Sequence, residues 1–317
     1  MKKNLKVNLI WLAILAAVYV LFTVLVSAGI LNVFHIQILE SIGINIILAV
    51  GLNLIVGFSG QFSLGHAGFM AIGAYATAIL TKGATDYLTF YISILVGALL
   101  AGLVAFVVGV PTLRLKGDYL AIATLGVSEI VRICLINGGE LTNGAAGIYG
   151  IPPFTTWSLV FIFAVITTVL TINFIKSPMG RNVLSVREDE IAAESMGVNT
   201  TKAKVIAFVI GAMTAAIAGS LQAGYVGAVV PKDFSIMNSI NVLIIIVFGG
   251  LGSMTGAIFA AIALGILNTV LQNVADLRMI IYSLALILVM IFRPGGLLGT
   301  WEFSLSRLWN KKKKEVN

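Results

Sequence analysis

Charged residues are scarce in this chain: Asp, Glu, Lys and Arg together make up 10% of its 317 residues. A water-soluble globular domain carries about a quarter charged residues. Hydrophobic residues make up 59% of the sequence instead, and the mean hydropathy is +1.05. Polar side chains are too few to cover a surface in water, so lipid must be part of the solvent. The composition predicts an all-α, polytopic bundle of transmembrane helices.

Cysteine and histidine are almost absent. The single Cys134 excludes a disulfide framework and paired-thiolate metal sites, and we interpret it as a small buried packing residue. The two histidines, His35 and His66, form no His-Glu-x-x-His motif, and no nucleotide-binding loop of the form Gly-x-x-x-x-Gly-Lys-Ser/Thr occurs. A nucleophile–base constellation is missing as well. The sequence therefore predicts a protein that is not an enzyme and that has no metal and no cofactor.

About ten hydrophobic segments follow one another, some of them broken or re-entrant, and we treat residues 1–317 as one membrane domain. The segments span residues 9–30, 36–57, 61–81, 88–110, 118–137, 156–175, 203–226, 236–249, 253–273 and 277–293. The first is long enough to cross a bilayer, so we interpret it as a retained span rather than a cleaved signal peptide.

Basic residues gather on one predicted side of the membrane. Ten crossings put both termini on the same side, together with a basic tail at 300–317, whereas the opposite side keeps Lys82, Lys232 and Arg278. The residues on the shared side are Lys2, Lys3, Lys6, Arg114, Lys116, Lys176, Arg181, Arg187, Lys202, Lys204, Arg293, Arg307, Lys311, Lys312, Lys313 and Lys314. This asymmetry predicts cytoplasmic termini and accounts for the net charge of +7 without nucleic-acid binding.

The segment 61–81 is the least regular, because glycines recur between residues 57 and 73 and polar side chains interrupt the apolar pattern. Irregular backbone at membrane depth occurs only where protein or a wet cavity satisfies it. The pattern Phe58-x-Gly60-x-x-Ser63 also recurs later, from Phe248 to Ser253. An internal repeat with broken helices and a chance match both explain it.

Charges inside the predicted spans are few, and the main ones are Glu40, Glu129 and Arg132. Glu129 and Arg132 lie three residues apart on a helix, where they can form a structural ion pair. An ion-driven carrier needs a free carboxylate on its path. We therefore expect the energy for any transport to come from outside this chain.

One long hydrophilic stretch, residues 177–199, predicts a short helix outside the membrane. Ser177 can cap it, Pro178 suits its first position and Gly197 can end it. We expect the apolar residues Val183, Val186, Ile191 and Met196 to form one packing side. A solvated loop helix and a docking helix for a cytoplasmic protein both fit this composition.

Several markers together are typical of one family. They are Gly51–Gly57, Ser63–Phe69, Gly73–Tyr75, Gly117–Leu125 with Glu129 and Arg132, Leu141–Gly144, Gly147–Ile148, Gly150–Pro152, Ser177–Arg181 and Arg293–Gly299. From about residue 36 to 299 the chain resembles the permease subunits of bacterial ATP-driven importers for branched-chain amino acids, and in particular the M-type permeases.

The resemblance implies a multi-pass protein of the bacterial inner membrane that lacks ATPase activity of its own. The partners it implies are a second permease subunit, two cytoplasmic ATP-binding subunits and an extracytoplasmic substrate-binding protein. It also implies that the stretch 191–197 is similar to the E-A-A-x-x-x-G loop that docks on an ATPase, although Ile191 stands where the first Glu of that loop falls. The ATPase-coupling residues are then Arg187, Glu188, Glu190, Ala192, Ala193, Glu194 and Gly197.

A path for an amino acid needs apolar walls and a few polar groups, and the glycine-rich segment 57–75 is our candidate lining. The lining residues we predict are Asn53, Gly60, Ser63, Gly65 and His66. Close helix packing is the alternative role of these glycines. Urea, amides and other amino acids remain alternative substrates, and a secondary carrier without an ATPase is the alternative mechanism.

Overall fold

The computed structural model describes residues 2–29, 31–83, 86–271, 284, 287, 291–292, 295–299 and 302. Its long helices are α1 (Lys2–Ser27), α2 (Val33–Asn53), α3 (His66–Thr81), α4 (Tyr87–Thr112), α5 (Asp118–Ile136), α6 (Trp157–Lys176), α9 (Thr200–Val226), α10 (Ile236–Gly249) and α11 (Met254–Val270). Two short helices, α7 (Pro178–Glu188) and α8 (Glu190–Ser195), lie between α6 and α9. The predicted all-α membrane bundle is confirmed.

Single turns and one strand pair complete the described chain. A π-helical turn, η1 (Leu54–Phe58), continues α2, and two 3₁₀ turns are η2 (Gly144–Ala146) and η3 (Pro231–Phe234). The strands β1 (Ile148–Tyr149) and β2 (Ala228–Val229) pair antiparallel, with Ile148 opposite Val229. This pair ties the α5–α6 connection to the α9–α10 connection.

Nine of the ten predicted segments are helices, but not all of them are full crossings. Within the described residues, five helices are long and apolar enough to span a membrane: α2 with η1, α4, α5, α6 and α9. Helices α10 and α11 meet at a bend of 118°, so they form one broken span or a re-entrant pair. Segment 61–81 becomes helical only from His66 onward. The predicted segment 277–293 and the basic tail 300–317 lie essentially outside the described residues.

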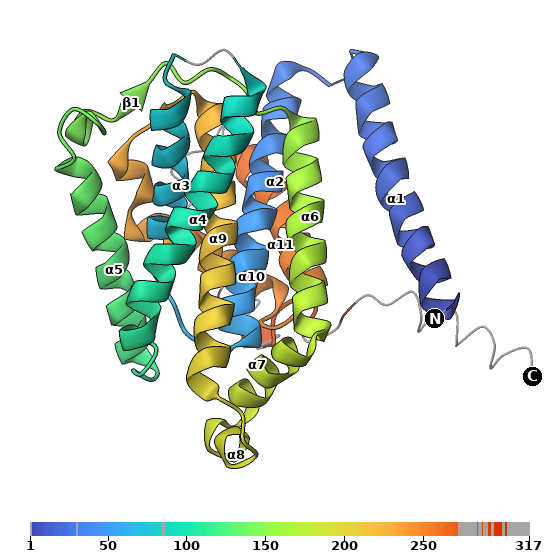
Figure 1. The fold of residues 1–317 in the computed structure, drawn as a ribbon. Coiled ribbons are helices and arrows are strands. Elements are labelled where there is room, and N and C mark those ends of the chain that lie inside the picture. Colours follow the sequence, from blue (N-terminus) through green and yellow to red (C-terminus); the bar gives the residue numbers. More distant parts are fainter. Residues whose placement is uncertain are drawn as a thin grey trace, which may run out of the picture.

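Small residues bring the central helices together. Helix α9 packs against α2, α3 and α4 in the middle of the bundle (Figure 1). A Cβ added to Gly73 on α3 would lie 2.0 Å from the carbonyl oxygen of Ala216 on α9, and one added to Gly219 would lie 2.0 Å from that of Met70. Glycine is needed here because the two backbones approach too closely for any side chain.

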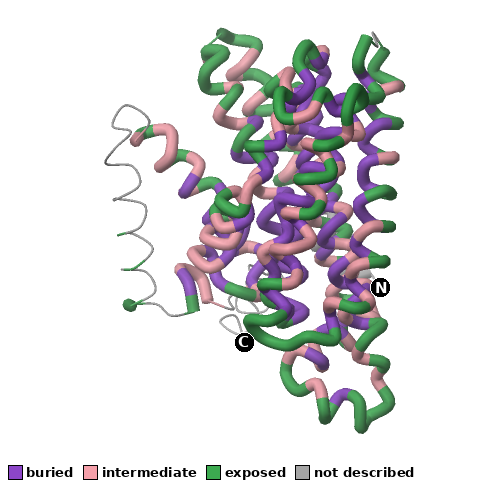
Figure 2. Tube along the Cα trace, turned by 90° about the vertical axis from the view of Figure 1, so that its left-hand side faces the viewer, coloured by how far each residue is buried: buried purple, intermediate pink, exposed green. Residues whose placement is uncertain are grey.

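The outer helices expose apolar side chains, as expected of a surface in lipid or against another membrane subunit. Leu95, Leu99 and Leu103 on α4 are each more than half exposed, as is Ile130 on α5. Figure 2 shows the buried residues running through the middle of the bundle and the exposed ones along its outer helices. Cys134 is also exposed on α5, so its assignment as a buried packing residue was wrong.

The two ends of the bundle differ in structure. Helices α7 and α8 project from the end at which α1 begins, and the β1–β2 pair lies at the opposite end (Figure 1). Helix α1 stands at the edge, where Tyr19 stacks on Trp157 of α6 at a ring-centroid distance of 5.3 Å. The hydrophilic stretch of the chain therefore forms its own unit at one end.

Candidate functional site

The hydrophilic stretch forms two helices rather than the single helix predicted. Ser177 Oγ accepts a hydrogen bond from the Gly180 N–H at 3.1 Å and Pro178 occupies the first turn, as expected of an N-terminus. The helix breaks at Asp189, whose Oδ1 accepts hydrogen bonds from the N–H groups of Ile191 (2.9 Å) and Ala192 (3.0 Å). Asp189 therefore caps a second helix, α8, which is followed by Gly197 at φ +83°. An Asp two residues before an Ile-Ala-Ala run was the sequence signal for this break.

The apolar residues of the stretch do not form one packing side. Val183 and Val186 on α7 are 2% and 5% exposed and belong to a core cluster with the ends of α2 and α9. Ile191 and Met196, at α8, are 73% and 84% exposed. The break at Asp189 changes the helix direction, so α7 is anchored to the bundle, whereas α8 buries only Ala193 in the same cluster and leaves Ile191 exposed.

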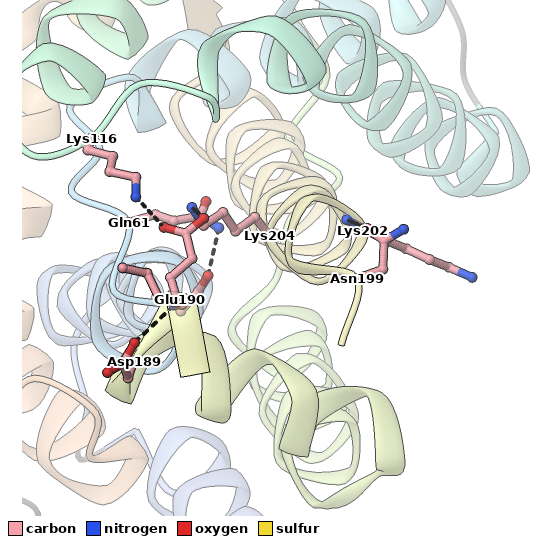
Figure 3. A network of polar contacts seen from close by, with 9 residues as sticks. Gln61, Lys116, Asp189, Glu190, Asn199, Lys202 and Lys204 are labelled. Carbon is pink, nitrogen blue, oxygen red and sulfur yellow. Dashed lines mark hydrogen bonds and ion pairs between the residues drawn. The ribbon is translucent and has the colours of Figure 1, made fainter. Parts of the chain in front are cut away.

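An ion network holds the start of α8 to the bundle (Figure 3). Lys204 Nζ of α9 donates to Glu190 Oε1 at 2.5 Å, and Lys116 Nζ, from the α4–α5 connection, lies 3.2 Å from Glu190 Oε2. Burial disfavours the charged form of Glu190, but the hydrogen bonds and charges of the two lysines outweigh it, so the pKa of Glu190 lies below its ordinary value. Glu190 thus anchors α8 instead of pointing freely outward. Nearby, Asn199 Oδ1 caps α9 by accepting from the Lys202 N–H at 2.9 Å.

Arg187 connects α7 to the break that follows α2. Its Nη1 donates to the carbonyl oxygen of Gly57 at 3.0 Å, and its guanidinium also pairs with Glu188. A Cβ added to Gly60 would lie 3.0 Å from Arg187 Cγ. Arg187 therefore ties α7 to η1, the turn that continues α2.

Two helix breaks lie side by side beneath Arg187, and Asn53 joins them. Asn53 is fully buried; its Nδ2 donates to the Ser253 carbonyl at 2.9 Å and its Oδ1 accepts from the Gly252 N–H at 3.0 Å. Gly60 and Gly250 end the preceding helical segments at φ +69° and +117°, which glycine adopts without strain. The two copies of the Phe-x-Gly-x-x-Ser pattern thus occupy matching places at helix breaks, and Asn53 and Gly57, just before the first copy, contact Gly252 in the second.

The other predicted path residues are enclosed by neighbouring helices. Ser63 Oγ accepts weakly from the Gly65 N–H at 3.4 Å, and a Cβ on Gly65 would lie 2.5 Å from the Thr124 carbonyl oxygen. His66 is 1% exposed, and neither ring nitrogen has a hydrogen-bond partner among the described residues. The structure therefore gathers the five predicted path residues around the first break, where Asn53, Ser63, Gly65 and His66 are buried and Gly60 is exposed.

Glu129 and Arg132 form an ion pair through several guanidinium–carboxylate hydrogen bonds on α5. The carboxylate side chain is 46% exposed on the outer face of the helix. No cluster of metal-ligating side chains occurs in the part of the chain that the structure describes.

Comparison with known proteins identifies the family. Residues 34–292 match the model of the branched-chain amino acid transport system permease component. The chain belongs to this permease family. It is 36% identical over 264 residues to the high-affinity branched-chain amino acid transport system permease protein LivM of Escherichia coli K12, a match covering 73% of this chain.

Other relatives of the permease include both kinds of subunit. A probable branched-chain amino acid transport permease protein LivM of Methanocaldococcus jannaschii is 25% identical, covering 73% of this chain and 75% of that protein. The permease protein LivH of Escherichia coli K12 is 30% identical, covering 56% and 58%. The permease spans about 62% of the length of the E. coli LivM that it matches. No solved structure matches it.

The permease also contains a cavity that its sequence did not predict. A cavity of about 110 Å³ lies between α2, α3, α9 and α10, and none of the five predicted path residues lines it. Its polar lining residues, such as Asn45 and Gln222, are isolated amides in apolar helices. Isolated amides within predicted spans are the sequence signal that points to such a cavity.

Proposed function

We propose that the chain is a transmembrane permease subunit of an ATP-driven importer for branched-chain amino acids. The family match over residues 34–292 carries this proposal. The relatives named LivM and LivH are described as permease proteins of high-affinity branched-chain amino acid transport systems. The sequence contains no nucleotide-binding loop, so the energy for transport is supplied by other subunits.

The partners we propose are a second permease subunit, two cytoplasmic ATP-binding subunits and an extracytoplasmic substrate-binding protein. The exposed apolar faces of α4 and α5 support a membrane partner, because they present a continuous surface for lipid or for another helix bundle. The gathering of Lys and Arg at the end that carries α7 and α8 supports a cytoplasmic location for that end.

Helix α8 is the proposed contact with an ATP-binding subunit. Its exposed residues include Ile191, Glu194 and Met196, so it offers apolar side chains flanked by a carboxylate. Glu190 holds α8 to α9 and to the α4–α5 connection, and Arg187 holds α7 to the break after α2. A displacement of α8 on closure of the ATPases is thereby passed to the helix breaks, which open the path alternately to each side.

Charge reversal on α8 tests the proposal. The permease is purified with its partner subunits, and the amount of bound ATPase and the ATP-dependent uptake of leucine into vesicles are measured. We expect Glu194→Lys to lose ATPase binding and uptake together. Glu140→Lys, the same change at an exposed residue of the α5–α6 connection, is the control and should retain both.

Two results would contradict this function. Leucine transport by the purified chain alone, without ATPases, would indicate a secondary carrier. Labelling of residues 181–197 from the extracellular side would place α7 and α8 out of reach of any ATPase. Competition of leucine uptake by urea, short amides and other amino acids identifies the substrate within the class.

A further inference from the structure

The cavity between α2, α3, α9 and α10 lies in the half of the bundle away from α7 and α8. Its lining comes from the middle of α2 and from the end of α9 and the start of α10, and these last two are at the same end as the β1–β2 pair (Figure 1). Ser41 at its rim is exposed, whereas Leu48 and Met70 at its inner end are buried. In the proposed orientation, a solute that leaves the extracytoplasmic binding protein meets this cavity.

The polar residues of the cavity have unused hydrogen-bonding capacity. The side chains of Ser41, Asn45 and Gln222 make no hydrogen bond to any residue that the structure describes. Asn238 Nδ2 donates to the Asp233 carbonyl at 3.1 Å, which leaves its amide oxygen as an acceptor. Unsatisfied amides inside a membrane protein cost several kcal/mol unless water or a ligand satisfies them. The cavity is therefore a wet site that can exchange water for a polar ligand.

The lining combines this polarity with an apolar wall and carries no Asp, Glu, Lys, Arg or His. Carboxamides supply N–H donors for a carboxylate and carbonyl acceptors for an ammonium group, so they suit a zwitterion without net charge. Ile44, Leu48 and Met70 form the apolar part. At about 30 Å³ per water molecule, 110 Å³ holds three to four waters, which suits the polar end of one small solute and not a peptide.

Two residues at the inner end of the cavity, Leu48 and Met70, flank the broken segment that follows α2. Leu48 lies on α2 close to the ring of His66, and Met70 lies one turn after His66 on α3. His66 is enclosed and has no hydrogen-bond partner among the described residues. The inner end of the cavity therefore borders the first helix break, which Asn53 and Arg187 connect to α7.

We propose that this cavity is a transient binding site for an apolar, zwitterionic amino acid within this subunit, with Asn45 and Gln222 binding the amino and carboxylate groups. The proposal rests on the proposed function and adds a site to it. Passage of substrate then depends on these two amides, whereas ATP hydrolysis by the partner subunits does not.

The test uses the complete importer reconstituted in proteoliposomes, with leucine as substrate. Asn45→Leu and Gln222→Leu remove the polar groups and fill the cavity, and Asn173→Leu, at an exposed residue of α6 outside the cavity, is the matched control. We expect each cavity variant to lower uptake per ATP hydrolysed by about tenfold or more, as for loss of a ligand's hydrogen-bond partner. ATPase activity stimulated by the binding protein should be retained, and Gln222→Asn should recover part of the uptake. Uptake at the control level in both cavity variants would overturn the proposal.

A second measurement does not depend on transport. Ser41→Cys in a Cys134→Ser background provides a single cysteine of this chain at the mouth of the cavity, and its rate of modification by a small methanethiosulfonate reagent is measured with and without leucine. We expect leucine, and not sorbitol, to slow the modification. Equal rates in a variant that retains leucine uptake would overturn the site. A wild-type complex that moves no leucine contradicts the proposed function, and the modification rates then decide on the cavity separately.

Discussion

Replacement of Asn53 by Ala tests whether this side chain holds the two helix breaks together. Asn53 makes two hydrogen bonds to backbone atoms about two hundred residues away in the sequence, at 2.9 Å and 3.0 Å, and it is fully buried. Removal of the Asn53 side chain affects the Ser253 carbonyl and the Gly252 N–H differently. The Ser253 carbonyl still accepts from the Ala257 N–H at 3.1 Å, whereas the Gly252 N–H has no other partner among the described residues.

The expected cost follows from this asymmetry. A buried donor left without an acceptor costs about 1–3 kcal/mol, and loss of an ordinary hydrogen bond costs about 0.5–1.5 kcal/mol. The sum predicts a decrease of about 1.5–4.5 kcal/mol in the free energy of unfolding. Hydrogen bonds between membrane helices average only about 0.6 kcal/mol, because a broken pair often finds other partners. The Gly252 N–H lies in a break between helices, where no helical carbonyl is available to accept its hydrogen bond. The cost of leaving this buried donor unpaired should therefore dominate.

The assay is reversible unfolding of the purified chain in mixed micelles by titration with sodium dodecyl sulfate. Asn173→Ala, at an exposed residue of α6, is the matched control for the change of Asn to Ala. Asn53→Asp retains the acceptor for Gly252 but sets a carboxylate oxygen against the Ser253 carbonyl, so it should not restore stability. A loss for Asn53→Ala no larger than that of the control would refute the role of this residue as a connection between the breaks.

Three further predictions follow from local contacts. Gly73→Ala should lower the free energy of unfolding by about 1–3 kcal/mol, because the added Cβ would lie 2.0 Å from a carbonyl oxygen of α9. The control is Gly126→Ala on α5, where space is open; it should be neutral or stabilising by up to about 1 kcal/mol. The same micelle titration measures both variants. The pKa of Glu190 is lowered on folding, so its contribution to stability is present at neutral pH and is lost as the pH falls below about 4.5. The difference in unfolding free energy between wild type and Glu190→Gln should therefore shrink below that pH. A difference that stays constant with pH would contradict the ion network. Arg187→Ala removes a charged hydrogen bond worth about 1.5–3 kcal/mol before screening of its part-exposed side chain. It should therefore destabilise the chain more than Arg181→Ala, the same change at an exposed residue of α7. Equal effects of the two changes would show that the contact with the helix break contributes little.

Much of the fold was predictable from the sequence, because the relevant physics is local. A run of about twenty apolar residues must be helical in lipid, since each backbone group needs a partner within the segment. The long helices α4, α5, α6 and α9 accordingly begin and end within a few residues of their predicted bounds. The caps at Ser177 and Gly197 were predictable for the same reason, because they depend on residues within one turn.

The structure corrected predictions wherever direction or distant contacts decided the outcome. Hydropathy cannot distinguish two crossings from one chain that turns back, so the sequence predicted broken or re-entrant segments but did not locate the bend of 118° between α10 and α11. In lipid, an apolar helix face can point inward or outward, which is why Cys134 was wrongly assigned to the interior. The prediction of a single helix at 177–197 was wrong, because the first helix ends at Asp189. There, capping of a new helix competes with continuation of the old one.

The candidate site also combines features that the sequence predicted with features that only the structure revealed. The sequence by itself determined that the chain is a membrane bundle, that residues 177–199 form its main hydrophilic unit, and that glycines break the segment after α2, because composition and short-range pattern specify these features. Only the tertiary structure decided that Asn53 joins two breaks, that Glu190 is held by Lys116 and Lys204, and that Asn45 and Gln222 share a cavity. These contacts link residues far apart in the chain, and they depend on how closely glycine-lined helices pack, which no local pattern encodes.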